Sequence, residues 1–369
     1  MKIFIAPLNW GLGHATRCVP LIDRFLAQGD EVVLGGDGLA LQYLQQRFPH
    51  LRSIELAPLN LRYSSGKRQV FAMLVAIPKL IRFSLRDHRL LKRIQAQESF
   101  DEIISDNRFG LWLPLNKTAT RYSKLPTIGR NQTASFNFQL STLNYRCVYI
   151  THQLHILFPR PYHWLEPLAA RLHAWVYKHY TEVWIPDTPD HRLSGDLSTL
   201  NFQLYKLKNF FKLSNNRAPL GLRTLNFQLK YIGPLSRFTT LNSQLPTKGR
   251  NQTASLNFKL STLNFYKIVA LFSGLEPHRT LFEQAILERY KGHEEDVLLV
   301  NGKLDKQLSD SELAYYLTHA EKIIARSGYS TIMDLDALGV LDKAELIPTP
   351  GQPEQEYLYT KHRTYIEHT

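Results

Sequence analysis

The sequence predicts an α/β protein built from two doubly wound, mainly parallel sheets, and three observations lead to this prediction. Short apolar segments that end in glycine or polar residues alternate with segments whose apolar positions recur at helical spacing. This alternation occurs twice, once before residue 190 and once after residue 267. A glycine-containing turn follows the first strand of each series, which is typical of sheets that bind ligands at the carboxyl ends of their strands.

The first half opens with a short apolar strand at 2–8, and a helix follows from His14. Leu21, Ile22 and Phe25 fall on one face of that helix and predict the side that packs on the sheet. Short apolar runs between polar turns predict the remaining strands. Further strands are expected at 31–36, 100–107, 146–153 and 181–187, with a second helix at 39–48.

The second half repeats the pattern, and a polar, turn-rich stretch at 187–196 separates it from the first. We therefore predict one domain at 1–190 and a second at 191–369. In the second domain, strands are expected at 267–274, 296–302, 322–328 and 343–351, and helices at 279–290, 311–320, 330–339 and from 354 onward.

Repeated sequence interrupts this pattern. GRNQTASFNFQLSTLNY at 129–145 returns at 249–265 with fourteen of seventeen positions unchanged, and shorter copies lie between the two. Stacked repeats need a steady period, and these copies are irregularly spaced. We interpret 125–146, 198–230 and 239–267 as low-complexity insertions in loops, which cost little closure entropy and leave the host fold intact.

The repeats also account for the charge of the chain. The formal net charge is +13, which by itself suggests a nucleic-acid partner. The three repeat segments carry twelve basic residues and no acidic ones, so the rest of the chain is nearly neutral. No nucleic-acid partner is expected. Two cysteines, Cys18 and Cys147, make neither a disulfide framework nor a metal site, and no signal-peptide pattern opens the chain, so a cytoplasmic location is expected.

The first strand–turn–helix junction carries the first candidate residues. Gly11 and Gly13 let the backbone approach a ligand, and His14 at the start of the helix can accept a proton near neutral pH. A nicotinamide fingerprint would need glycine at position 16, where the chain has Thr16. Asp106 follows a later strand and is expected at the same edge of the sheet. A tight turn with a capping histidine is the alternative interpretation.

The second half carries two similar junctions. Ser273 and Gly274 follow one strand, and Arg326, Ser327 and Gly328 follow another; both junctions precede helices whose N-termini favour phosphate. Arg279 and Arg326 would add positive charge. The residues further along are suited to a sugar: Asp334 in a helix is able to accept two ribose hydroxyls, and Gln352, Glu354 and Gln355 offer amide and carboxylate groups to a polyhydroxylated ligand.

Taken in order, four segments resemble a known family. They are GLGHATR at 11–17, LFSGLEPHR at 271–279, ARSGYSTIMDL at 325–335 and IPTPGQPEQEY at 347–357. They resemble the GT-B fold glycosyltransferases related to the peptidoglycan N-acetylglucosaminyltransferase, glycosyltransferase family 28. The resemblance covers 1–115, 146–196 and 268–360 and excludes the repeats.

The resemblance implies a cleft between two Rossmann-like domains, with an acceptor side on the first and a UDP-sugar site on the second. It implies transfer of a sugar, an N-acetylhexosamine, from the UDP-sugar to an acceptor hydroxyl with inversion. His14 would be the general base, and neither a metal nor a cofactor is required, since the UDP-sugar is a substrate. By the same resemblance Ser273 and Gly274 lie near the diphosphate, Arg326, Ser327 and Gly328 line the nucleotide pocket, Asp334 stands where the family has a ribose-binding glutamate, and Gln352, Glu354 and Gln355 contact the donor sugar.

Other functions stay open at this point. A UDP-sugar epimerase of the same fold would act without an acceptor, and the insertions are also compatible with an inactive copy. The acceptor, a glycan or a lipid-linked molecule, is not specified by the sequence. Residues 70–94 mix apolar and basic residues at helical spacing, which fits either a peripheral contact with the inner face of an anionic plasma membrane or a packed helix with a basic outer face.

Overall fold

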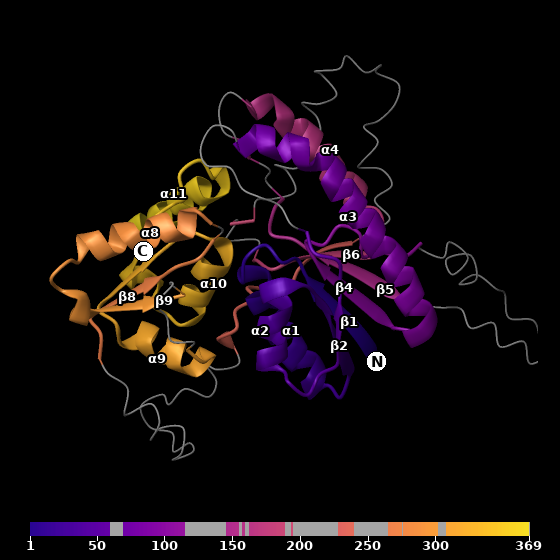
Figure 1. Ribbon diagram of the computed structural model, residues 1–369, viewed down its shortest axis with the longest axis horizontal. Helices are drawn as coiled ribbons and strands as arrows, with labels where there is room; N and C mark the ends of the chain where they lie inside the picture. The colour runs from indigo at the N-terminus through magenta and orange to yellow at the C-terminus, as the bar shows by residue number, and fades with distance from the viewer. Residues whose placement is uncertain are drawn as a thin grey trace, which may run out of the picture.

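The protein consists of two α/β units, each built on a parallel sheet with helices on both faces, as the sequence predicts. Figure 1 shows the units side by side, the first mainly in indigo to magenta and the second in orange to yellow. The repeat segments lie mostly outside the described residues, so their position in loops stays a prediction. The computed structural model describes residues 1–59, 69–114, 145–154, 157–158, 162–188, 193–194, 228–239, 265–274, 276–301 and 308–368.

The first sheet has seven strands in the order β3-β2-β1-β4-β5-β6-β7, and all neighbouring pairs are parallel. Because β1 has β2 on one side and β4 on the other, the winding direction reverses between β1 and β4. Pro7 at the end of β1 pairs with Asp106 at the end of β4, at this switch point. The strands are β1 (Lys2–Pro7), β2 (Glu31–Gly36), β3 (Ser53–Glu55), β4 (Glu102–Asp106), β5 (Arg146–Ile150), β6 (Glu182–Ile185) and β7 (Gln228–Tyr231).

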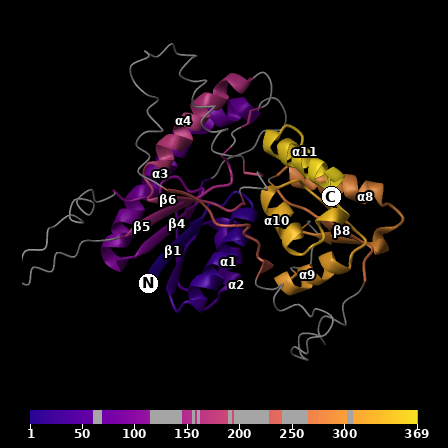
Figure 2. The ribbon, with the colours of Figure 1, turned by 180° about the vertical axis from the view of Figure 1, so that it is seen from behind.

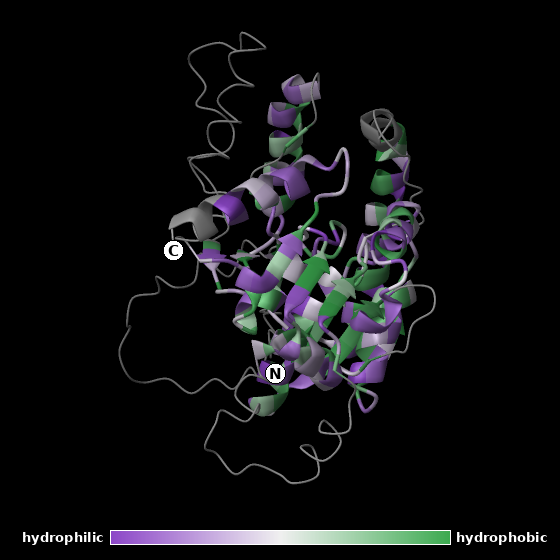
Figure 3. Ribbon diagram, turned by 90° about the vertical axis from the view of Figure 1, so that its left-hand side faces the viewer, coloured by the Kyte–Doolittle hydropathy of each residue, from purple (hydrophilic) through white to green (hydrophobic). Residues whose placement is uncertain are grey.

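Different helices cover the two faces of this sheet because side chains alternate along its strands. Ile3 and Ile5 of β1 pack with the first two helices, whereas Phe4 and Ala6 pack with the next two. The strands are therefore apolar on both faces, as the green sheet in Figure 3 shows. The helices are α1 (Gly13–Ala27), α2 (Gly38–Arg47), α3 (Gln69–Glu98) and α4 (Glu166–Tyr177).

The second sheet has four parallel strands in the order β11-β10-β8-β9. Its switch point lies between β8 and β10, because β9 flanks β8 on the other side. Ala270, Phe272 and Ile324 pack against α8, and the alternate residues Val269 and Ile323 pack against α9, α10 and α11. These elements are β8 (Ile268–Leu271), α8 (His278–Arg289), β9 (Val297–Val300), α9 (Asp310–His319), β10 (Lys322–Ala325), α10 (Tyr329–Ala337), β11 (Ala344–Leu346) and α11 (Pro353–His368).

The structure corrects the sequence analysis at residues 228–231. The prediction placed 228–230 inside an insertion of the second domain, whereas β7 pairs in parallel with β6 and extends the first sheet. Leu229 packs against the core on the α3 and α4 side, so these residues have the alternation that a sheet requires. The repeat-like segment TLNFQL at 224–229 overlaps the start of β7 and hid this signal.

Direct contacts join the two units. The Ser330 hydroxyl at the start of α10 donates to the carbonyl of Gly13 at 3.1 Å, and the Tyr329 hydroxyl donates to the carbonyl of Pro186. On another side, Asp310 accepts from the Tyr43 hydroxyl at 3.2 Å and pairs with Arg47 at 3.3 Å. Figure 2 shows α10 beside α1, as Figure 1 does from the opposite side. The carboxyl edges of the two sheets therefore meet at these helix starts.

No helix among the described residues is long and apolar enough to cross a membrane.

Candidate active site

The candidate site begins at the first switch point. His14 is the second residue of α1, and Asp106 is the last residue of β4. Because β1 and β4 are neighbours, the loop after β1 brings the imidazole directly over the end of β4. His14 Nδ1 lies 3.1 Å from Asp106 Oδ1. The imidazole does not cap the helix, since Leu12 occupies that position and makes no side-chain cap.

Arg17, one turn further along α1, completes this cluster. Its Nε donates to Asp106 Oδ2 at 2.5 Å, and its Nη2 donates to Asp106 Oδ1, so the guanidinium grips both carboxylate oxygens. Nη2 also lies 2.7 Å from His14 Nδ1. Arg17 and Asp106 are both buried, with 1% and 0% of their surface exposed. Bidentate pairs of this kind fix orientation as well as charge.

The cluster determines the ionisation of its members. Burial opposes the charge on Asp106, but Arg17 and His14 outweigh it and lower the pKa of Asp106 to about 2. Burial and the nearby Arg17 charge lower the pKa of His14, although Asp106 partly opposes that shift. His14 is therefore neutral at pH 7. This is the protonation state that a general base requires.

The loop after β5 and the start of α11 extend the cluster into the second unit. Arg17 Nη1 donates to His152 Nδ1 at 2.5 Å, and His152 Nε2 lies 2.9 Å from Glu354 Oε1. Gln153 Nε2 donates to the other oxygen of Glu354 at 3.0 Å. Two consecutive residues of the first unit thus hold both oxygens of one carboxylate of the second.

The glycine loop approaches the second unit at Gly13, and the predicted contact of this loop with a ligand stays a prediction. A Cβ built on Gly13 would lie 2.8 Å from the Ser330 hydroxyl, so glycine here allows the second unit to approach. Gly11 has a φ of 85°, which favours glycine, and a Cβ there would meet open space. Close backbone approach at Gly13 is therefore made to the protein itself.

The second switch point brings the junctions after β8 and β10 together. Ser273 and Gly274 follow β8, and Gly274 has a φ of 97° with open space beside it. Arg326, Ser327 and Gly328 follow β10, and the backbone of Gly328 begins α10. The Ser327 hydroxyl is buried and donates to the carbonyl of Gln355 at 2.8 Å, so it supports the loop.

Arg326 is the unusual residue of this edge. Arg326 is 6% exposed, and its guanidinium donates to backbone carbonyls alone, the nearest being that of Pro348 at 3.1 Å from Nη1. Nε is buried without a hydrogen-bond partner, and no carboxylate among the described residues pairs with this cation. The ring of Phe282 lies 4.0 Å from the guanidinium. Burial lowers the pKa of Arg326 to about 10, so the group stays charged at pH 7.

Two other predicted donor residues have protein partners. Arg279 pairs with Glu276 at 2.7 Å on the exposed start of α8 and does not contribute a free charge. Asp334 is buried, not solvated, and accepts from the Ser236 hydroxyl at 2.7 Å and Arg237 Nε at 3.1 Å. Burial raises the pKa of Asp334. A ribose at Asp334 would have to share oxygens that already accept hydrogen bonds.

The residues predicted to contact the donor sugar are also occupied. Gln355 Oε1 accepts from the backbone N–H of Thr349 at 2.8 Å, and Gln355 Nε2 donates to Gln352 Oε1 at 2.7 Å. Together they brace the loop between β11 and α11. Glu354 faces His152, as described above. Their contact with a sugar stays a prediction, and it would require these bonds to be exchanged.

The sequence analysis gives no role to Arg17, His152 or Gln153. Arg17 looked like an ordinary polar residue on a helix. Its position three residues after His14 was the one available signal, since such pairs share a helix face. The partners of Arg17 lie on other strands and in the other domain, so no local sequence pattern indicates them.

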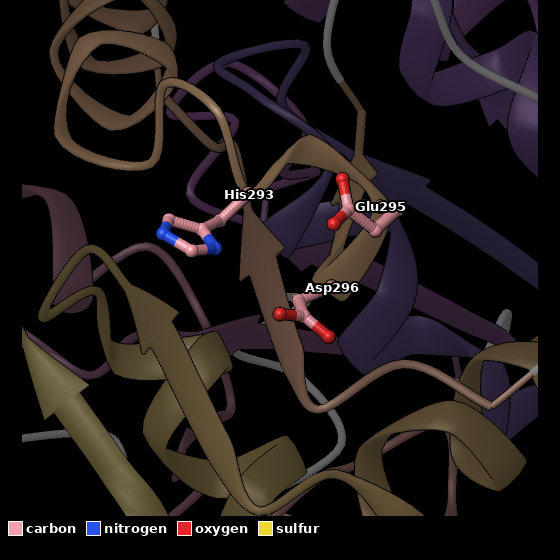
Figure 4. Close-up of side chains that lie close together, drawn as sticks. All are labelled: His293, Glu295 and Asp296. Carbon is pink, nitrogen blue, oxygen red and sulfur yellow. The ribbon is translucent and has the colours of Figure 1, made fainter.

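A possible metal cluster lies away from this edge. Its members are His293, Glu295 and Asp296, whose side chains Figure 4 shows close together. Each offers one ligand atom, and these atoms lie within 4.8 Å of one another. They precede β9 and therefore lie at the amino edge of the second sheet, opposite the switch point. Asp296 is engaged by Lys267 at 3.0 Å, and His293 and Glu295 are exposed. Such clusters are common on surfaces, and we assign no metal site to this one.

Comparison with known proteins finds fold-level likenesses only. No family model matches the chain, and no curated protein matches it. Over 98% of its length the chain is similar to an Arabidopsis thaliana UGT solved with UDP, with 14% identity, 82% of that chain covered and a TM-score of 0.49. It is also similar over its whole length to a spinosyn rhamnosyltransferase solved with thymidine diphosphate, with 13% identity, 91% of that chain covered and a TM-score of 0.47.

A putative UDP-N-acetylglucosamine 2-epimerase from Listeria monocytogenes shows a similar likeness, with 11% identity, 100% of this chain and 88% of that chain covered, and a TM-score of 0.44. Likenesses at this level say nothing about the reaction. The resemblance to glycosyltransferase family 28 therefore stays a prediction, and the function has to be argued from the residues.

Proposed function

We propose that the protein transfers a sugar, an N-acetylhexosamine, from a UDP-sugar to an acceptor hydroxyl, with inversion and without a metal ion. The observation that carries this proposal is the pairing of two sites at one interdomain edge. A neutral histidine held by a buried carboxylate lies at the first switch point, and a buried arginine without a carboxylate partner among the described residues lies at the second. A base facing an anion site is what transfer from a nucleoside diphosphate sugar needs.

The donor half of the proposal rests on Arg326. A buried cation is costly unless an anion compensates it, and none of the described side chains does so. The amino end of α10 and the open backbone at Gly274 lie beside it, and helix N-termini favour phosphate. A diphosphate would supply the missing negative charge and the missing acceptor for Nε.

The acceptor half rests on His14. In the proposed step, Nε2 of His14 removes the proton of the acceptor hydroxyl as that oxygen bonds to the anomeric carbon. The bond between the anomeric carbon and the diphosphate oxygen breaks, and UDP leaves with the electron pair. Asp106 stabilises the imidazolium that forms, and Arg326 stabilises the leaving diphosphate. Attack from the side opposite the leaving group inverts the configuration.

Calorimetry on the full chain tests the donor site first, with UDP, UMP and uridine as probes. We expect UDP to bind more tightly than UMP, and uridine to bind weakest, because the diphosphate carries the interaction with Arg326. Equal affinity for UDP and uridine would contradict the role of Arg326. If none of the three binds, the protein has no functional donor site.

Product analysis then separates transfer from epimerisation. Incubation with a UDP-N-acetylhexosamine alone should release UDP only slowly, and a competent acceptor should accelerate it. Appearance of a second UDP-sugar epimer without any acceptor would instead indicate an epimerase. The two outcomes are distinguished by the same chromatographic separation of nucleotide sugars.

The acceptor is proposed to be presented at a membrane surface, because α3 and α4 each expose large apolar side chains and α3 also exposes basic ones. Trp112 connects the two helices, because its ring lies between the ring of His88 on α3 and the ring of His179 just after α4, with 4.1 and 4.2 Å between ring centroids. On α4 and the turn before it, four large apolar side chains are at least half exposed and follow one stripe, Trp164, Leu168, Leu172 and Trp175.

Between residues 75 and 97, the exposed charges of α3 are all positive. Between residues 75 and 97 the one acidic residue, Asp87, is buried against Arg108. The exposed apolar residues of α3 are Val75, Ile77, Ile81 and Leu85, and its exposed basic residues include Arg82, Arg86, Arg89, Lys92 and Arg93. Exposed tryptophans beside cations are typical of helices that lie on anionic lipid. A peripheral contact at the inner face of the plasma membrane is therefore part of the proposal.

Flotation with vesicles tests this contact. The chain should float with vesicles of phosphatidylglycerol and phosphatidylcholine, and less with phosphatidylcholine alone. Replacing Trp164 and Trp175 with serine should abolish flotation, whereas replacing Leu281 and Leu287, exposed leucines of α8, with serine should leave it unchanged. Equal flotation of both variants would contradict the assignment to α3 and α4.

A further inference from the structure

Asn107 directly follows Asp106 and has an unusual backbone conformation. Its φ is 54°, in the left-handed region, which glycine adopts freely and asparagine more readily than most other residues. Its backbone N–H donates to the carbonyl of Ile150 at 3.2 Å, so Asn107 lies where β4 and β5 both end. Residues held in such conformations gather at binding sites, where the surrounding structure keeps them in place.

A buried tyrosine fixes the side chain of Asn107. The Tyr149 hydroxyl donates to Asn107 Oδ1 at 3.0 Å, and Tyr149 is 0% exposed. A buried hydroxyl needs an acceptor for its proton, and Oδ1 is the one acceptor that the described residues offer it. The opposite orientation of the amide would leave this proton without a partner. Tyr149 therefore determines which amide atom of Asn107 points away from the core.

The amide nitrogen of Asn107 is a donor that the protein does not use. None of the described residues accepts a hydrogen bond from Nδ2. Nδ2 is not among the fully buried atoms that lack a partner in the described part of the chain, so it keeps contact with the surface. The residue as a whole is only 6% exposed. Asn107 thus presents one donor in a fixed direction at the first switch point.

This donor lies between the proposed base and the helices proposed to face the membrane. Asp106, the preceding residue, holds His14 of α1 on one face of the sheet. Tyr149 packs on the other face, where its ring lies 5.6 Å from the ring of Tyr177 on α4, measured between centroids. An acceptor presented at α3 and α4 would approach His14 from the side on which Asn107 is anchored.

We propose that Asn107 is an acceptor-binding residue, whose Nδ2 donates to an uncharged oxygen beside the reacting hydroxyl of a sugar acceptor. The assignment rests on the proposed function, because it names a binding group for the acceptor of that reaction. Two ionised carboxylates, Asp106 and Glu354, belong to the same edge, so a neutral donor here favours a hydroxyl or carbonyl oxygen over an anionic one. A sugar carries such oxygens on the carbons next to the reacting one. Asn107 orients the acceptor, and no covalent bond forms or breaks at it.

Nuclear magnetic resonance of the full chain with ¹⁵N-labelled asparagine tests this assignment without any need for activity. Methyl β-N-acetylglucosaminide is the probe, added in the presence of UDP. The side-chain NH₂ signal of Asn107, assigned by its loss in Asn107→Asp, should shift and saturate as the probe is added. If this signal does not respond to the probe, the proposal is wrong.

Asn301 is the matched control. It directly follows β9 in the second sheet, has a φ of 62° and is exposed, so it shares the residue type and the left-handed backbone but not the site. Its side-chain signal should stay unchanged during the titration. An equal response of Asn107 and Asn301 would indicate a general effect of the probe and would overturn the assignment.

Two variants separate the amide of Asn107 from its backbone conformation. Asn107→Gly keeps the left-handed backbone and removes the side chain. Asn107→Asp keeps the shape and the acceptor for Tyr149, but it replaces the outward donor with a carboxylate oxygen. With UDP-N-acetylglucosamine as donor and the same glycoside as acceptor, Asn107→Gly should lower kcat/KM for the acceptor about tenfold, the effect of one hydrogen bond. Asn107→Asp should lower it further.

Asn301→Gly should leave this kcat/KM unchanged, and calorimetry should show the same UDP affinity in all variants, because the donor site belongs to the second switch point. Unchanged kcat/KM in both Asn107 variants would overturn the proposal. Equal losses of kcat/KM and of UDP affinity would indicate a disturbed fold and would overturn it as well. If the Asn107 signal shifts as expected while wild type transfers no sugar, the binding role stands and the proposed function fails.

Discussion

The two switch points of this protein differ in their charge balance. At the first, Arg17 compensates the charge of Asp106, and the cluster continues to a second carboxylate, Glu354. These charged groups therefore have hydrogen-bond partners within the protein. At the second, Arg326 is also buried, but its hydrogen bonds go to backbone carbonyls alone, and its Nε has no hydrogen-bond partner among the described residues. The difference teaches that one edge is built to hold a proton-accepting group in place, whereas the other is built to receive an anion.

The largest expected effect comes from removing the His14 imidazole at the first switch point. His14→Ala should lower kcat by about 10²–10⁴-fold, because it removes the proposed base. Affinity for UDP should change less than about twofold, since His14 belongs to the other switch point. Calorimetry and steady-state rates measure the two effects, with His293→Ala at the amino edge as a control. Equal losses of rate and of UDP affinity would argue against the base role.

The second prediction compares the two arginines by stability. Arg17→Met should lower the free energy of unfolding by about 3–5 kcal/mol, because Asp106 is left buried and unpaired. Arg326→Met should leave it unchanged or raise it, because an uncompensated buried cation is replaced by an apolar side chain. Denaturant unfolding of the full chain, without nucleotide, measures both. A large loss of unfolding free energy in Arg326→Met would show that the protein itself compensates the charge of Arg326.

The third prediction sharpens the comparison with the ligand present. Arg326→Met should weaken UDP binding by about 10- to 100-fold, the range expected for hydrogen bonds to a charged group. Arg279→Met should have little effect, because Arg279 is paired with Glu276 on the exposed start of α8. Calorimetry with UDP measures both. Similar losses of UDP affinity in the two variants would indicate that UDP responds to the overall charge of the protein and not to a specific site at Arg326.

The smallest expected effect concerns pH. His14 is active when neutral, so kcat/KM should be full above its pKa and fall about tenfold per pH unit below it. Burial and Arg17 lower that pKa, so the midpoint should lie below 6.5, the value of a free histidine. A midpoint above 6.5 would contradict this direction. The ionisable groups facing His14 are Arg17, Asp106 and His152, with Tyr329 and Glu354 beyond them.

The stability of the protein should also depend on pH, through Asp106 at the first switch point. Asp106 has a folded pKa of about 2, below its value of 3.8 in an unfolded chain. Its contribution to stability is therefore full above pH 3.8 and is lost as the pH falls toward 2. Acid unfolding of wild type should show this loss, and Asp106→Asn should remove it from the profile.

Local pattern was enough to predict the repeated αβ units and the loops that matter. Every strand expected from apolar runs is present, from 2–8 to 343–351, because buried parallel strands must be apolar on both faces. The helix expected at 311–320 is present as α9, and Ser309 and Glu312 form a capping box at its start. The carboxyl edges were the expected location of His14, Asp106 and Arg326, because each lies at or just after the end of a parallel strand.

What pattern failed to predict was what each of these side chains touches. Arg279 and Asp334 looked free in sequence but are paired with Glu276 and Arg237. β7 was hidden in repeat-like sequence and is a strand through its pairing with β6. These facts depend on partners far apart in the chain.

The sequence by itself therefore determined the fold class, the two carboxyl edges and the presence of a histidine and an arginine there. Only the tertiary structure decided that Arg17 grips Asp106, that Glu354 crosses to His152 and that Arg326 has no carboxylate beside it among the described residues. The physical reason is that local backbone preferences act over a few residues. Charge compensation in a buried site is set by groups that the folded chain brings within hydrogen-bond distance.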